Sequence, residues 1–231
     1  MMSVPQDLID KIEDLRERAL HLEELPKGFA SDPIEQEYLE FENLAKLHPY
    51  MGEKLEEVYL LLVRAKFGKI HEFSAFHLLK SLLIVSTIAS VIGCGIILLV
   101  GVSARMLSQD QIALMSSFII GVFSAVFCHE MAHVLIMVKS FGIIGTIHSS
   151  FMIGLVPRVS EEVKAHSCTR LAAYSSGPLA NLALVLLALL SFKNVVAMVN
   201  LFVLVINIIP IGEGLVMTDG KQVLREIACW K

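Results

Sequence analysis

The side chains best suited to metal binding and proton transfer are two histidines and a glutamate in the segment His129-Glu130-Met131-Ala132-His133. Histidines four residues apart lie one turn apart on the same face of a helix, so both imidazoles can bind one metal ion. Glu130 points about 100° away around the helix axis, near enough to accept a proton from a water molecule at the site. The H-E-x-x-H pattern is typical of zinc metallopeptidases and predicts a zinc centre with its own general base.

The surroundings of this motif favour a metal. It lies inside the apolar run 112–138, which is flanked by Gln111 and Lys139. Ionisable side chains in hydrocarbon cost several kcal/mol and need a compensating partner, which a metal ion provides. The alternative is a chance match on a solvated helix face, which this run does not offer. Lys139 lies ten residues after His129, so the metal is expected about 15 Å inside the boundary of the apolar run.

Composition and charge divide the chain into two parts. The 231 residues are 55% hydrophobic and only 18% charged, more apolar than an ordinary soluble domain. Residues 1–60 hold 15 of the 23 acidic and 6 of the 19 basic side chains, and the remaining residues have a net charge of +5. We expect an acidic, helical cytosolic region over 1–75 and a membrane domain over 76–231. The acidic balance of the first region argues against nucleic-acid binding and against adhesion to anionic lipid.

Apolar residues recur at helical spacing three times in the acidic region. The inward positions of the three predicted helices are Leu8, Ile12, Leu15, Ala19 and Leu22; Ile34, Tyr38, Phe41 and Ala45; and Leu55, Val58, Leu62 and Ala65. These helices are expected to form a small bundle, or to dock on the membrane domain or on a regulatory partner.

The predicted fold class is an all-α polytopic membrane protein with about four transmembrane helices. Four apolar segments approach the length that crosses a bilayer, over 81–104, 112–138, 171–192 and 195–211. The uncharged segment 140–157 mixes glycine with β-branched and polar residues, so a re-entrant or β-hairpin segment lining the site is expected there. Most Lys and Arg beyond residue 60 fall on the side of the acidic region, which predicts a cytosolic orientation for the site.

Two polar residues within the apolar segments are further candidates. His148 lies in the predicted hairpin and is a rival metal ligand. Asn181 lies in the third apolar segment. Its amide either bonds neighbouring helices together or donates a hydrogen bond to the scissile carbonyl or its oxyanion, and both readings stay open.

Three motifs in this order resemble the site-2 protease family of intramembrane zinc metalloproteases. They are His129-Glu130-Met131-Ala132-His133, then Ser176-Gly177-Pro178-Leu179-Ala180-Asn181, then Asn207-Ile208-Ile209-Pro210 followed by Asp219-Gly220. The resemblance covers about 112–227 and leaves the acidic region outside it. It implies that His129, His133 and Asp219 bind one Zn²⁺ ion per chain, that Glu130 activates the water, and that the site opens toward the cytosol.

The sequence departs from the family pattern in one place. Residues 212–217 lengthen the stretch between Pro210 and Asp219, so Glu213 is a rival third ligand. Asp219 is also a candidate N-cap of the last helix, a position where Asp is favoured.

The predicted function is an intramembrane zinc metalloprotease that hydrolyses peptide bonds of a membrane-associated polypeptide. Glu130 is the expected base, Asn181 the expected second catalytic residue, and the lipid bilayer and a membrane protein or peptide substrate the expected partners. The alternative is a non-proteolytic zinc-binding membrane scaffold or immunity factor. Glu130 argues against it, because a scaffold needs metal ligands but no base.

Overall fold

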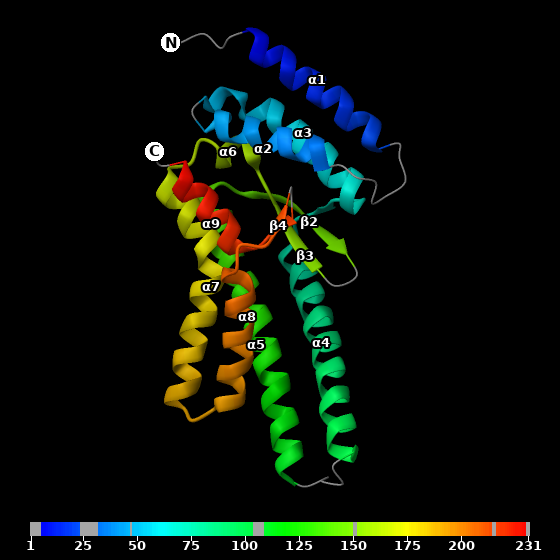
Figure 1. The fold of residues 1–231 in the computed structure, drawn as a ribbon, viewed down its shortest axis with the longest axis vertical. Coiled ribbons are helices and arrows are strands. Elements are labelled where there is room, and N and C mark those ends of the chain that lie inside the picture. The colour runs from blue at the N-terminus through cyan, green and yellow to red at the C-terminus, as the bar shows by residue number, and fades with distance from the viewer. Residues whose placement is uncertain are drawn as a thin grey trace.

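The computed structural model describes residues 6–23, 32–46, 48–103, 109–149, 152–213 and 216–229, and these are mostly helical. Helices make up most of the fold, and short strands lie between some of them along the chain (Figure 1). In chain order the elements are α1 (Gln6–Glu23), α2 (Asp32–Ala45), η1 (Pro49–Met51), α3 (Gly52–Phe67), β1 (His71–Glu72), α4 (Ala75–Ser103), α5 (Gln109–Ser140), β2 (Ile143–Ser149), β3 (Met152–Pro157), α6 (Val159–Glu162), α7 (Ser167–Leu190), α8 (Asn194–Ile208), β4 (Gly212–Glu213), β5 (Val216–Met217) and α9 (Asp219–Ala228).

The first three helices form a bundle, which we call the head (α1–α3). The inward positions that helical spacing predicts meet in one buried cluster, in which Leu15, Leu55 and Leu62 are fully buried. This cluster also takes in Val159 and Val163, which belong to α6 and the residue after it. The head therefore shares its hydrophobic core with the part of the chain predicted as a separate membrane domain.

Among the described residues, three helices are long and apolar enough to cross a membrane, and they lie within α4, α5 and α7. Their apolar segments are Leu78–Ile96, Ala113–Ser140 and Ser167–Leu190. The fourth expected span, 195–211, corresponds to α8, an apolar helix of 15 residues. At 1.5 Å per residue this helix is about 22 Å long, shorter than the hydrocarbon core of a typical bilayer.

A β-hairpin joins α5 to α6, as the composition of 140–157 predicts. Strands β2 and β3 are antiparallel, with Thr146 opposite Leu155, and β1 pairs with the other edge of β2. Gly142 enters the hairpin with φ +81°, a backbone conformation that glycine adopts without strain. The sheet and α9 lie between the head and the long helices (Figure 1).

A buried ionic cluster connects the head to α7 and α9. The ammonium group of Lys46, just after α2, contacts Glu226 of α9, whose other oxygen accepts from Arg170 Nε of α7 at 2.8 Å. The three side chains are 5%, 1% and 6% exposed. Because an isolated charge is costly in the interior, these groups depend on one another. The cluster holds α9 against the head.

Glu162, at the end of α6, belongs to the same cluster and accepts a hydrogen bond from the Tyr174 hydroxyl. Burial raises the pKa of Glu162 from its ordinary value of 4.5 to about 8. The nearby carboxylates of Glu42 and Glu226 act in the same direction, while Lys46 opposes them. Glu162 is therefore expected to keep its proton at neutral pH.

Candidate metal centre

The predicted metal ligands meet where α5, α7 and α9 come together. His129 and His133 lie on one face of α5, and Asp219 is the first residue of α9. Asp219 Oδ2 lies 3.0 Å from His129 Nε2 and 3.2 Å from His133 Nε2. One possible ligand atom from each of the three residues lies within 4.8 Å of the other two. The structure thus brings together two residues of one helix and a carboxylate 86 residues further along the chain.

A glycine of α7 lets the helix pack directly against the paired imidazoles. A Cβ atom at Gly177 would lie 2.6 Å from His129 Cε1 and 2.7 Å from His129 Nε2, and would also collide with His133 Nε2. No side chain larger than hydrogen fits there without moving the rings. Gly177, which the sequence analysis names only as part of the second motif, therefore forms the back wall of the site.

The hydrogen-bond partner of His133 determines which ring nitrogen faces Asp219. His133 Nδ1 lies 2.8 Å from the Ala173 carbonyl oxygen, which can only accept. Nδ1 must therefore carry a proton, and in a neutral ring Nε2 then bears a lone pair. That lone pair points at the Asp219 carboxylate across 3.2 Å. Two acceptors, His133 Nε2 and the Asp219 carboxylate oxygen, then face each other with no hydrogen atom between them. A cation bound between them would remove this repulsion, so the residues present fit a metal ion.

His129 has its own partner on α7. Asn181, which is completely buried, lies with its side-chain nitrogen 3.0 Å from His129 Nδ1. Its side-chain oxygen is buried and has no hydrogen-bond partner among the described residues. The structure thus places the Asn181 amide behind the His129 ring. A role as donor to a substrate carbonyl stays a prediction.

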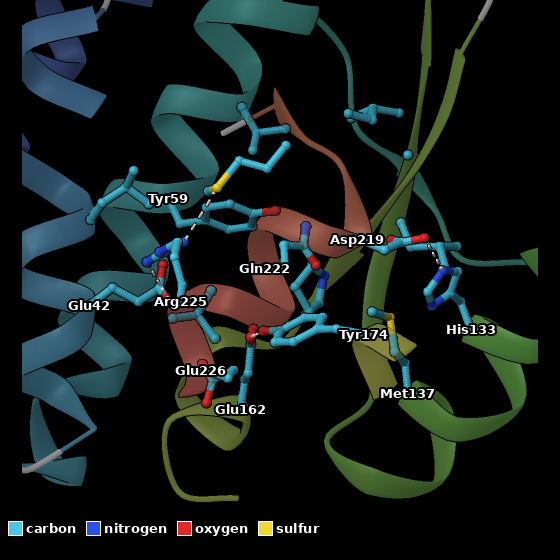
Figure 2. Close-up of a pocket in the computed structure, with 18 of the residues that line it drawn as sticks. Glu42, Tyr59, His133, Met137, Glu162, Tyr174, Asp219, Gln222, Arg225 and Glu226 are labelled. Carbon is cyan, nitrogen blue, oxygen red and sulfur yellow. Dashed lines mark hydrogen bonds and ion pairs between the residues drawn. The ribbon is translucent and has the colours of Figure 1, made fainter. Parts of the chain in front are cut away.

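The centre opens into a cavity of about 280 Å³ that reaches the head. His129, Glu130, His133 and Asp219 line one part of it. Figure 2 shows Asp219 facing His133 on one side, and Glu42, Tyr59 and Arg225 gathered on the other. The predicted base and the three predicted ligands therefore share one cavity, whose other walls include α2 and α3.

The rival ligands are placed only in part. The backbone of His148 lies in β2 opposite Ile153, and that of Glu213 lies in β4 opposite Val216. The side chains of both fall outside the described part of the structure. The N-cap of α9 is Thr218 rather than Asp219, because Asp219 already belongs to the first turn.

Ala173 and Ser176 also contact the site, although the sequence analysis assigned no role to either. Ser176 Oγ donates to the Ala173 carbonyl at 2.7 Å and lies 3.1 Å from His133 Nδ1. A signal for these contacts exists in the sequence. Ala173, Gly177 and Asn181 recur every four residues, which places them on one face of α7.

No family model, no curated protein and no solved structure matches this chain. The site must therefore be interpreted from its own chemistry. Two imidazole nitrogens and one carboxylate oxygen form a donor set that suits Zn²⁺, and three protein ligands leave the fourth position of a tetrahedral site open. In zinc proteins generally, three protein ligands with one open position are typical of catalytic sites, whereas structural sites use four protein ligands.

Proposed function

We propose that this protein is an intramembrane zinc metalloprotease, similar to the site-2 protease family, that hydrolyses peptide bonds of a membrane-associated polypeptide. One observation carries the proposal. Asp219 reaches both imidazoles of the H-E-x-x-H helix, while Glu130 lines the same cavity. Ligands alone would serve a scaffold, but a carboxylate beside them in the cavity is what hydrolysis requires.

In this proposal the metal ligands and Glu130 have separate roles in hydrolysis. A zinc ion bound by His129, His133 and Asp219 would polarise the peptide carbonyl and lower the pKa of a water molecule. Glu130 takes the proton from that water as it attacks the carbonyl carbon. Glu130 then delivers the proton to the departing amine, which leaves as the C–N bond breaks.

The hairpin supplies a place for an extended substrate. Strand β3 pairs with β2 along one edge, and no described strand occupies its other edge. A substrate helix must unwind before its carbonyls are accessible, and an unwound segment can pair with a free strand edge. We place the site toward the cytosol on the basis of the basic residues near the head, and we include α8 as a fourth, short crossing.

Substrate trapping with Glu130→Gln tests this proposal. Full-length protein is purified in detergent, its zinc content is measured by elemental analysis, and polypeptides retained by the variant are identified by mass spectrometry. Wild-type protein should contain about one zinc per chain and cut the retained polypeptide. Glu130→Gln should bind zinc but cut at least about 100-fold more slowly, because a general base contributes about 10²–10⁴-fold.

Glu161→Gln is the matched control, since the Glu161 side chain is half exposed on α6 and pairs with Lys164. It should cut at the wild-type rate. Equal cutting by Glu130→Gln and wild type would refute the proposal. A wild-type phenotype for Glu130→Gln together with loss of function in His129→Ala would instead favour a zinc-dependent scaffold.

A further inference from the structure

We infer that Asn181 is a positioning residue for the metal centre: its side-chain oxygen accepts the Nδ1–H of His129 and directs Nε2 of that ring toward Asp219. The inference rests on the proposed function and extends it from the ligands to the groups that orient them. It assigns Asn181 to the ring of His129 rather than to the substrate.

The geometry of the pair supports this role. A neutral imidazole has one N–H donor and one acceptor, so a ring that binds metal through Nε2 must carry its proton on Nδ1. That N–H needs an acceptor. The Asn181 amide lies 3.0 Å from His129 Nδ1, and its oxygen has no partner among the described residues. A half-turn of the amide exchanges its nitrogen and oxygen and brings the unpaired oxygen to Nδ1.

The second imidazole has the equivalent arrangement. The Ala173 carbonyl accepts from His133 Nδ1 at 2.8 Å. Ala173 and Asn181 lie two turns apart on one face of α7, with Gly177 between them. This face therefore supplies one acceptor to each ring and close packing at the midpoint. Histidine ligands in metal sites almost always have such a partner on their other nitrogen, and it fixes the ring orientation.

Burial separates this role from the two others considered for Asn181. The side chain is 0% exposed, so a substrate carbonyl has no access to it. A residue whose only role is to join two helices could form its hydrogen bond with any polar group on the neighbouring helix. The partner here is the first histidine of the predicted metal motif, 52 residues earlier in the chain.

Zinc affinity provides a test that does not depend on a substrate. Full-length protein in detergent competes with a chromophoric chelator for Zn²⁺. Asn181→Ala should weaken zinc binding by about 10–100-fold, the usual effect of losing such a partner. Asn181→Leu, which fills more of the space but accepts no hydrogen bond, should weaken it similarly. Asn181→Asp keeps an acceptor and should bind zinc within about threefold of wild type.

Asn200→Ala is the matched control. Asn200 is also a fully buried asparagine in an apolar helix, but it bonds to Ser124 and to the Val196 carbonyl of its own helix. Zinc binding by this variant should be unchanged. Circular dichroism of each variant establishes that it is folded before its affinity is compared.

Wild-type affinity in Asn181→Ala or Asn181→Leu would overturn the inference and leave the proposed function intact. An Asn181→Asp variant as weak as Asn181→Ala would overturn it as well, because the acceptor would then be irrelevant. A wild-type protein that binds no zinc would instead contradict the proposed function itself, and this inference with it.

Discussion

Replacing Gly177 with Ala should damage the metal centre while leaving the fold nearly intact. Elsewhere in a helix this change is expected to stabilise by about 0.5–1 kcal/mol. At this position the new Cβ would lie 2.6 Å from His129 Cε1, where ordinary contact begins at 3.4 Å. The ring must then move by about 0.8 Å, whereas metal–ligand distances tolerate about 0.2 Å. Overpacking costs about 1–3 kcal/mol, partly offset by the helix preference of Ala.

We therefore expect Gly177→Ala to lose about 100-fold in zinc affinity, at the upper end of the effect of disturbing ligand orientation. Its free energy of unfolding should change by less than about 2 kcal/mol. Chelator competition measures the first quantity and denaturant unfolding in micelles the second. Gly95→Ala is the control, since a Cβ at Gly95 of α4 would meet nothing within 4 Å. Wild-type zinc affinity in Gly177→Ala would refute the reasoning.

Two further predictions concern the ionic cluster. Lys46→Met removes a cation from buried Glu226 and should lower the free energy of unfolding by about 3 kcal/mol, measured by denaturant titration. Lys54→Met breaks a pair with Glu13 in which both side chains are 45% exposed, and should cost about 0.5 kcal/mol; equal losses would contradict the burial argument. Folded protein keeps a proton on Glu162 up to about pH 8, whereas the unfolded chain loses it near 4.5. The folded state therefore binds more protons between these values, and stability should fall as pH rises from about 5 to 8. Thermal unfolding across this range should show a flatter slope in Glu162→Gln, and an unchanged slope would assign the pH dependence to other groups.

Much of the fold could be predicted because it depends on local patterns. The inward positions of the head, such as Leu15, Leu55 and Leu62, follow helical spacing and are buried. The hairpin over 140–157 was predicted from its glycines and β-branched residues, and it is present. The fourth span, predicted over 195–211, is a shorter helix in the structure, because residue type does not fix where a helix ends. Helix α8 ends at Ile208, and 15 residues are fewer than a full crossing requires.

The contacts that could not be predicted join residues far apart in the chain. Lys46 meets Glu226 across 180 residues, and local composition offers no sign of this pairing. His129 and His133 could be paired from spacing alone, because one helix sets their separation. Asp219 required the resemblance to a known family, since nothing local ties it to a helix 86 residues earlier. The partner of Asn181 depended on how α7 is rotated against α5, which periodicity does not determine.

The shared core of the head and α6 has a practical consequence for anyone who shortens this protein. A fragment that starts at residue 76 would uncover Val159 and Val163 to water and would leave Glu226 with Arg170 as its remaining cation within the cluster. Such a fragment would tend to aggregate through the exposed valines. Loss of function in it would therefore not test the role of the metal centre. The acidic head is thus better regarded as an integral part of the fold than as a removable appendage.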